Sequence, residues 1–432
     1  MKKSQKINIF WFRRDLRIED NIGLAKAFAD GLPVLPVFIF DKNILDKLQN
    51  PTDARVTFIY DTLKKIDNEL REKGSGILIL HGSPLECWND ILERYNVNEV
   101  FYNKDYEEYG HNRDVEIKTN LLSHGIKTND FKDHVIYEPG EVLKSDGTPY
   151  TVYTPFSKVW KAKFLNQSLA KPLKITPNWT QVQIPKFPEI TAIGFEKSDL
   201  EVQQFNLDHS FLSNYAEFRD NPSADKGTNL GPHLRFGTIS VRKAVKIAFE
   251  NDEKLLNELI WREFFIQILA KFPHVSKSAF KPKYDKIDWE NNELHFQAWC
   301  DGKTGYPFVD AGMRELKATG RMHNRVRMIA AGFLCKHLLI DWRWGEAWFA
   351  RHLLDYELAS NNGNWQWAAG TGCDAAPYFR IFNPETQLKN FDLQLKYVKK
   401  WIPEFETPNY SLPIVEHKWA RERCLVRYKA IM

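Results

Sequence analysis

A chain of 432 residues is longer than one ordinary folding domain, so we expect two domains. Hydrophobic residues make up 43% of the chain and charged residues 27%, and this balance excludes disordered and fibrous proteins. The formal net charge of +4 is small, so any binding of nucleic acid must depend on a local basic patch and not on the whole surface.

The five cysteines are widely spaced and form no C-x-x-C pair. This pattern predicts free thiols, without a disulfide framework, a metal site or an iron–sulfur site. The sequence shows no signal-type apolar region near its start and no apolar stretch of membrane-spanning length. We therefore expect a cytoplasmic protein that makes no contact with a membrane.

Short apolar runs alternate with amphipathic stretches in the first third of the chain. The expected strands are 7–12, 34–40, 77–80 and 99–102, and the expected helices are 23–29, 54–73, 84–95 and 113–122. This alternation predicts a doubly wound parallel sheet of Rossmann-like type. The first strand is not followed by a G-x-G-x-x-G fingerprint, so a dinucleotide is not expected to bind here.

Prolines interrupt this pattern in the middle of the chain. Residues 131–207 contain Pro172, Pro177, Pro185 and Pro188 and show weak periodicity, which predicts a long connector. Helical periods dominate beyond it, at 240–249, 255–272, 306–319, 321–339 and 345–354. We therefore predict an α/β domain over 1–130, a connector over 131–207 and an all-α domain over 208–432.

One expected helix, 257–272, carries polar side chains at helical spacing. Glu258, Trp261, Arg262 and Phe265 stand at i, i+3, i+4 and i+7, so a carboxylate, an indole and a guanidinium share one face. Such a face can hold a nucleobase. An exposed face with an ordinary Glu–Arg pair fits the same spacing, so spacing alone leaves both interpretations open.

A second polar face is expected in the segment 322–328. Asn324, Arg327 and Met328 share it at i, i+3 and i+4, and an amide there can read a base edge. Arg325 points away from that face, toward a DNA phosphate or simply toward solvent.

Two turns are also expected to line a ligand. In 355–367, the Asn-Asn-Gly-Asn cluster is expected to end a helix, and a pair of tryptophans follows it. In 227–240, a turn of small residues leads into a helix, an arrangement that lets backbone amides approach phosphates.

These segments together resemble the photolyase and cryptochrome flavoprotein family over nearly the whole chain. The most similar branch is that of the bacterial (class I) cyclobutane-dimer photolyases, because Asn324 stands where the (6-4) photoproduct branch typically has a histidine. The segments that carry the resemblance are RRDLR from Arg13, GKTGYPFVDAGMR from Gly302, MHNRVRMI from Met322, LLIDWRWGE from Leu338, NNGNWQW from Asn361, DAAPYFRIFNP from Asp374 and PIVEHKWAR from Pro413.

The resemblance implies that FAD, reduced in the active form, binds within the helical domain. Arg327 and Asp355 would pair beside the flavin ring, and the amide of Asn361 would face flavin N5, where it stabilises a reduced, anionic flavin that an acid would disfavour. The turn 227–231 lacks two hydroxyl donors of the family's usual T-S-x-L-S. The implied FAD contacts are Tyr215, Gly227, Thr228, Asn229, Leu230, Gly231, Arg327, Asp355, Tyr356, Glu357 and Asn361.

The resemblance also implies light-dependent repair of DNA. Excited reduced FAD would donate one electron to a cyclobutane pyrimidine dimer, which then splits and returns the electron. The dimer must first leave the base stack, and photolyases are known examples of such extrusion. Glu258 and Asn324 would hydrogen-bond the pyrimidine edges. The implied contacts to the lesion or the DNA backbone are Arg219, Trp261, Arg262, Arg325, Met328 and Trp367, of which the two tryptophans form the pocket walls.

Three further tryptophans match the family's electron relay. Trp365 would lie next to the flavin, Trp342 in the middle and Trp289 at the surface. Indole suits stepwise one-electron transfer because it is readily oxidised. The chain has fourteen tryptophans, so core packing is the alternative for any three of them.

The residues around Tyr109 bear on whether the chain binds an antenna pigment. Tyr109 and Gly110 stand where folate-binding relatives place an Asn-Glu pair, so a folate antenna is not expected, and a deazaflavin, a second flavin or no antenna stay open. UV-damaged DNA is the expected partner of a monomer without an obligate protein partner. A cryptochrome-type blue-light photoreceptor and a (6-4) photolyase are the alternatives to dimer repair.

Overall fold

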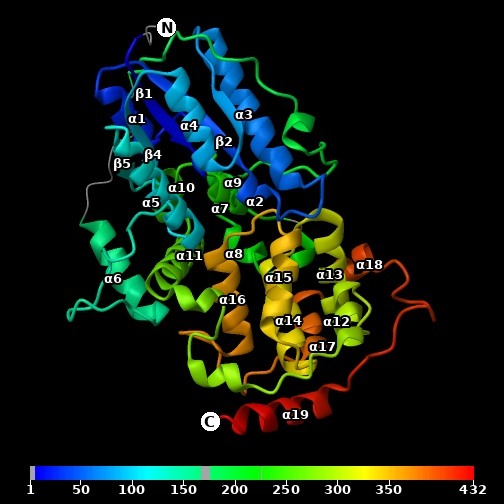
Figure 1. Cartoon of the computed structure of the whole chain (residues 1–432). Helices are drawn as coiled ribbons and strands as arrows, with labels where there is room; N and C mark the ends of the chain where they lie inside the picture. Colours follow the sequence, from blue (N-terminus) through cyan, green and yellow to red (C-terminus); the bar gives the residue numbers. More distant parts are fainter. Residues whose placement is uncertain (1–4, 167–175, 225) are drawn as a thin grey trace. The chain divides into compact units, whose positions relative to one another are not determined.

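The computed structural model describes residues 5–166, 176–224 and 226–432. The chain divides into two compact units (Figure 1). Unit 1 comprises 1–138, 161–205 and 229–247, and unit 2 comprises 139–160, 206–228 and 248–432.

Unit 1 is built on a parallel sheet of five strands in the order β3-β2-β1-β4-β5. From β1 the chain first adds strands toward one edge of the sheet (β2, β3) and then toward the other (β4, β5), as in a doubly wound fold. The predicted α/β class is therefore confirmed. The strands are β1 (Ile7–Phe12), β2 (Val34–Asp41), β3 (Leu78–Gly82), β4 (Val97–Asn103) and β5 (Lys127–Phe131).

Helices cover both faces of this sheet, which explains the apolar runs in its central strands. In β1, Phe10 and Phe12 point into one core, and Ile9 and Trp11 point into the other. The first core is closed by α1 (Ile22–Ala29) and α3 (Ala54–Glu72), and the second by α4 (Pro84–Arg94) and α5 (Glu108–Ser123). A short helix, α2 (Lys42–Leu45), follows β2.

The segment 229–247 also belongs to unit 1, and charged side chains hold it there. The carboxylate of Asp133 is 1% exposed and forms ion pairs with Arg17 and Arg242. Arg242 also pairs with Asp20 at 3.1 Å. The helices of this segment are α9 (Leu230–Phe236) and the first part of α10 (Val241–Asn251).

The predicted connector 131–207 needs a correction, because it contains a helix, α6 (Tyr153–Leu165). Pro155 lies inside α6 but does not interrupt it, because it is in the first turn, where a backbone N–H has no partner within the helix. Part of the connector, 167–175 with Pro172, lies outside the described residues.

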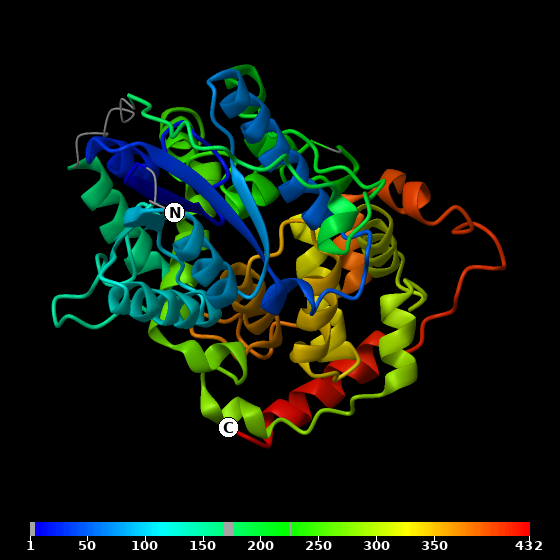
Figure 2. The same cartoon turned by 45° about the horizontal axis from the view of Figure 1, so that its top comes forward.

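Unit 2 is helical, as predicted. Its helices are α7 (His209–Leu212), α8 (Tyr215–Phe218), α11 (Glu253–Lys271), α12 (Glu293–Cys300), α13 (Pro307–Thr319), α14 (Asn324–Gly332), α15 (Trp342–His352), α16 (Leu358–Ala369), α17 (Pro384–Phe391), α18 (Lys396–Trp401) and α19 (His417–Lys429). Figure 2 shows α19 in red, and it packs against the π-helical turn Phe333–His337. This turn continues α14 directly, so the helical segment runs from Asn324 to His337, within the predicted helix 321–339.

The core of unit 2 is rich in indole rings. Trp299, Trp342 and Trp365 are each at most 2% exposed and lie in one apolar cluster with Leu334 and Phe349. Within the described ranges, no helix is both long and apolar enough to cross a membrane.

Candidate active site

Glu258 lies on α11 and is the acceptor of a small polar cluster. The hydroxyl of Tyr215 donates to Glu258 Oε2 at 2.8 Å, and Arg219 Nε donates to Oε1 at 2.9 Å. Burial and the nearby carboxylate raise the pKa of Tyr215, so its hydroxyl stays a donor. Tyr215, which the resemblance implied as an FAD contact, is bonded here to Glu258.

Trp261 lies one turn further along α11 and contacts two aromatic rings. It stacks on Tyr153 with ring centroids 3.7 Å apart and planes within 5°. Phe265 lies next to it at 5.3 Å. The predicted shared face of Glu258, Trp261 and Phe265 therefore lies on one continuous helix, and it is not a simple solvated surface.

Two of the arginines predicted to contact DNA are paired within unit 2. Arg262 donates to the buried Glu357 at 2.8 Å. Arg325 donates to Asp220 at 2.7 Å, and its guanidinium lies 4.3 Å from the ring centre of Phe391. Contacts of these arginines with DNA stay predictions.

Asn324 begins α14 and is exposed, and Met328 on the same helix is half-buried. The preceding residue, His323, caps the helix, because its Nδ1 accepts the backbone N–H of Arg325. Burial lowers the pKa of His323 to about 4, so the ring is neutral at pH 7. The cap therefore fixes where Asn324 starts the helix.

The predicted pair of Arg327 and Asp355 is present in the structure. Arg327 Nη2 donates to Asp355 Oδ2 at 2.9 Å, and Arg327 Nε donates to the backbone oxygen of Met322. The other oxygen, Asp355 Oδ1, is buried and has no hydrogen-bond partner among the residues that the structure describes. A buried acceptor without a donor costs about 1–3 kcal/mol, so this atom fits a donor that a ligand supplies.

Asn361 lies inside α16, and this corrects the prediction that the Asn-Asn-Gly-Asn cluster ends a helix. The asparagines in this cluster bond to other groups instead of capping: Asn361 Nδ2 donates to Glu346 Oε1 at 2.9 Å, and Asn362 Nδ2 donates to the backbone oxygen of Val275. Gly363 is needed because the ring of Phe265 occupies the space of a Cβ. Burial raises the pKa of Glu346.

The predicted phosphate turn 227–231 spans the boundary between the units. Thr228 belongs to unit 2, where its backbone oxygen accepts the N–H of Asn206 at 2.9 Å. Asn229 belongs to unit 1 and has a left-handed φ of 52° ahead of Leu230, the first residue of α9. Gly227 and Gly231 are half-buried.

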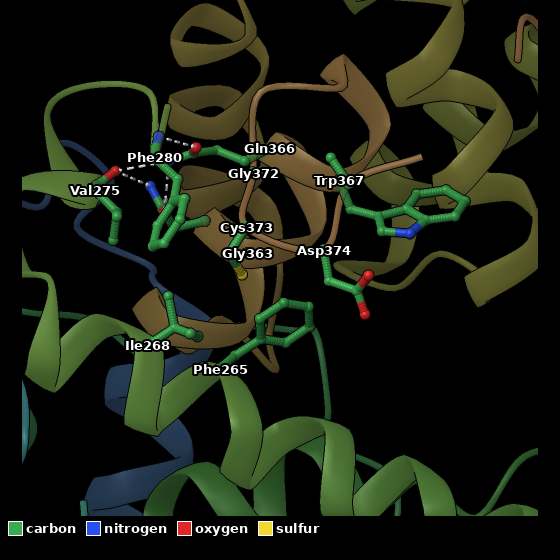
Figure 3. Close-up of a pocket in the computed structure, with 12 residues that line it drawn as sticks. Phe265, Ile268, Val275, Phe280, Gly363, Gln366, Trp367, Gly372, Cys373 and Asp374 are labelled. Atoms are coloured by element: carbon green, nitrogen blue, oxygen red, sulfur yellow. Dashed lines mark hydrogen bonds between the residues drawn. The ribbon is translucent and has the colours of Figure 1, made fainter. Parts of the chain in front are cut away.

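A small, partly open pocket in unit 2 is lined by residues of α11 and α16 (Figure 3). It contains one of the predicted pocket walls, Trp367, together with Phe265. The other residues that line it are Ile268, Val275, Phe280, Asn362, Gly363, Gln366, Gly372, Cys373, Asp374 and Ala375. Its walls are mainly apolar and aromatic, as in sites for flat ligands.

Comparisons with known proteins decide the family. Residues 8–177 match the model described as DNA photolyase, and residues 255–408 match the FAD binding domain of DNA photolyase. The deoxyribodipyrimidine photo-lyase of Escherichia coli is 35% identical, over 98% of each chain. That of Halobacterium salinarum is 34% identical, over 98% of this chain and 99% of its own. The chain belongs to the DNA photolyase family.

Solved structures of the family have the same fold. A bacterial class III photolyase from Agrobacterium tumefaciens superposes with a TM-score of 0.86 at 33% identity, over 100% of this chain and 98% of its own. An archaeal photolyase from Sulfolobus tokodaii, solved with two FAD molecules, gives 0.85 at 33%, over 98% and 99%. A Synechocystis cryptochrome gives 0.84 at 26%, over 99% and 100%. The assignment to class I stays a prediction.

The FAD-binding domain that the photolyase model matches contains several of the predicted FAD residues. Among the residues that the structure describes, Asp355 Oδ1 has no donor; Asn361 is 9% exposed, and its hydrogen bonds to Glu346 use the amide nitrogen. Tyr356 packs against the indole-rich core. These groups fit a buried, polar ligand such as FAD.

The predicted relay tryptophans of this photolyase lie in one cluster. Trp342 and Trp365 are each 2% exposed, and the half-buried Trp289 packs against the same core. Gly345, one turn after Trp342 on α15, leaves room for the ring of Trp365. Of the three, only Trp289 is partly exposed, and burial does not order the other two, so the relay stays a prediction.

Sequence reasoning missed Tyr153, Glu346 and Asp374. Each reaches a predicted site residue only through the fold: Tyr153 stacks on Trp261, Glu346 accepts from Asn361, and Asp374 lines the pocket beside Trp367. Glu346 and Asp374 stand within the family segments LLIDWRWGE and DAAPYFRIFNP, and that was the signal that could have singled them out.

Proposed function

We propose that this chain repairs cyclobutane pyrimidine dimers in DNA by means of light. The observation that carries the proposal is the joint presence of Glu258 and Trp261 on one face of α11, inside the segment that matches the FAD-binding domain of photolyases. The relatives named deoxyribodipyrimidine photo-lyase support it over whole-chain length.

FAD bound in unit 2 supplies a photoexcitable one-electron donor. The ion pair of Arg327 and Asp355 would hold the flavin, and Asp355 Oδ1, which has no donor among the described residues, would accept a hydrogen bond from it. Asn361 is held in one orientation by Glu346, so its free carbonyl oxygen and not its NH₂ group is left for a neighbour. We keep the other predicted FAD contacts, from Tyr215 and 227–231 to Tyr356 and Glu357, within this proposal.

Glu258 serves as the acceptor for pyrimidine N–H groups. A carboxylate offers about four lone-pair sites; Tyr215 donates one hydrogen bond to Glu258 and Arg219 donates two, so about one site is left. The side chain is 36% exposed, so a flipped base can reach this site. The two donors fix the carboxylate before the base arrives, and this lowers the entropic cost of binding.

Trp261 and Trp367 form apolar walls that exclude water from the flipped dimer. Stacking of a base on an aromatic ring contributes about 1–3 kcal/mol. Asn324, exposed at the start of α14, offers both a donor and an acceptor to the pyrimidine edges. Arg219, Arg262, Arg325 and Met328 remain proposed contacts to the lesion or the DNA backbone.

We further propose that the protein acts as a monomer in the cytoplasm, on UV-damaged DNA, without an obligate protein partner. Within this proposal, 208–432 is the catalytic region, 131–207 the connector and 1–130 the region for a second, light-harvesting chromophore. The Sulfolobus tokodaii structure, solved with two FAD molecules, supports a second flavin as a candidate.

The test uses purified, reduced protein and three oligonucleotides of one sequence: undamaged, with one cyclobutane dimer, or with one (6-4) product. Each is illuminated with blue light, and restored bases are measured by chromatography. We expect restoration of the cyclobutane dimer alone. Restoration of the (6-4) product instead, or of neither lesion, would overturn the proposal.

A further inference from the structure

Tyr153 lies face to face with Trp261, with ring centroids 3.7 Å apart and planes within 5°. Tyr153 is the first residue of α6, and Trp261 lies in the middle of α11. We propose that Tyr153 is a positioning residue that fixes the indole plane of Trp261 as a platform for a stacked pyrimidine. This inference rests on the proposed function.

Two polar contacts hold Tyr153 in place. Its backbone N–H donates to Asp374 Oδ2 at 2.9 Å, and its hydroxyl donates to the backbone oxygen of Asn257 at 2.9 Å. Burial raises the pKa of Tyr153, so this hydroxyl remains a donor. The carboxylate of Asp374 also lies at the N-terminus of α6, where the helix dipole favours a negative charge.

The helix that carries Tyr153 is itself anchored to α11. Phe156, one turn later, lies 5.3 Å from Phe264, and Trp160 Nε1 donates to Glu263 at 2.6 Å. Tyr153, Phe156 and Trp160 stand at i, i+3 and i+7 and so share one face of α6. These contacts hold α6 against α11, and the ring of Tyr153 cannot turn away from Trp261 without loss of the hydrogen bond from its hydroxyl to Asn257.

A base should bind a fixed indole more tightly than a mobile one. Immobilising a side chain on binding costs about 0.5–1.5 kcal/mol, and the stack with Tyr153 removes that cost before the base arrives. Because Tyr153 covers one face of Trp261, a base must use the other face. Asp374, which accepts from the backbone N–H of Tyr153, also lines the pocket with Trp367 (Figure 3).

The test compares Tyr153→Leu, which removes the stacked ring, with Tyr153→Phe, which keeps the ring and loses the hydroxyl. Dissociation constants are measured in the dark for a dimer-containing oligonucleotide and for its undamaged equivalent. We expect Tyr153→Leu to bind the dimer about threefold to tenfold more weakly, the size of an aromatic pair contribution, with unchanged binding of undamaged DNA and unchanged FAD absorbance. Tyr153→Phe should bind the dimer more tightly than Tyr153→Leu does, because its ring still stacks on Trp261 although the hydroxyl bond to Asn257 is lost.

If Tyr153→Leu binds the dimer as tightly as the wild type does, the inference is overturned. Equal losses of undamaged-DNA binding and of FAD would also overturn it, because these indicate a general structural role. If Tyr153→Leu fails to fold, Tyr153→His, which keeps a smaller ring, replaces it: an intermediate dimer affinity supports the inference, and wild-type affinity overturns it. A wild-type protein that does not prefer dimer DNA overturns the proposed function itself, whereas a preference that Tyr153→Leu retains overturns the inference alone.

Discussion

The ring of Trp365 occupies the space that a Cβ on Gly345 would take. Its Cη2 and Cζ3 atoms come closer to that position than any real Cβ contact, and Leu334 closes the same space from another side. Helices α15 and α16 therefore approach each other only because residue 345 has no side chain. This contact sets how near Trp365 lies to Trp342, one turn earlier on α15.

Gly345→Ala should destabilise the protein and displace Trp365. Alanine in a helix is favoured over glycine by roughly 0.5–1 kcal/mol, but overpacking costs about 1–3 kcal/mol. We therefore expect the variant to unfold at a lower temperature than the wild type. Light-driven reduction of oxidised FAD should also slow. Gly332→Ala is the matched control, because the nearest atom to its Cβ is Phe382 Cδ2 at 4.0 Å. Equal behaviour of the two variants would contradict this account.

Trp289→Phe should slow light-driven flavin reduction and leave repair by pre-reduced protein nearly intact. Phenylalanine keeps the ring packing of the half-buried Trp289 but is much harder to oxidise. Flash photolysis and the dimer-repair assay measure the two activities. Trp401→Phe, a half-buried tryptophan packed on the same core, is the control. Equal losses of reduction and repair in Trp289→Phe would refute the relay.

Asp355→Asn should reduce FAD binding. The substitution removes the ion pair with Arg327 and weakens an acceptor, and a hydrogen bond to a charged group contributes about 1.5–3 kcal/mol, so we expect at least about tenfold weaker binding. The ratio of flavin to protein absorbance measures it. Glu404→Gln breaks a pair of similar exposure, Arg314–Glu404, and should keep full FAD content. Full FAD content in Asp355→Asn would argue against this site.

His323 should make stability depend on pH between about 6.5 and 4. Burial lowers its pKa from 6.5 to about 4, so in this range the unfolded chain binds a proton that the folded chain does not. Stability is therefore present above pH 6.5 and falls as pH drops toward 4, by up to about 3 kcal/mol. His323→Asn keeps a capping side chain but cannot titrate, so its unfolding free energy should fall less. Parallel curves for both proteins would contradict the assignment.

The fold could be predicted where burial is uniform. Of the four strands predicted from the sequence, β1, β2 and β4 are central and contain apolar runs, and β3 lies at one edge of the sheet but begins with the apolar residues Leu78, Ile79 and Leu80. Strand β5 lies at the other edge with the polar sequence KTNDF and was missed. Helix α6 was missed because prolines dominate the surrounding sequence, and because the partners of its aromatic face lie on α11, far along the chain.

The site could be predicted as far as local spacing and family motifs reach. Helical spacing placed Glu258, Trp261 and Phe265 on one face of α11, and the motifs supplied the pair of Arg327 and Asp355. Tertiary partners leave no local pattern: Tyr153 meets Trp261 only because α6 packs on α11. The asparagines of α16 looked like a cap because their bonds to Glu346 and Val275 are invisible in sequence.

The central claim is that light drives the splitting of the dimer and that the flavin is not oxidised in the overall reaction. The most direct test gives single flashes to pre-reduced protein bound to an equal amount of dimer-containing oligonucleotide, without added reductant, and counts restored pyrimidines and reduced flavin after each flash. We expect pyrimidines to accumulate over successive flashes while the flavin remains reduced. Dimers that stay whole, or one flavin oxidised for each dimer split, would contradict the account.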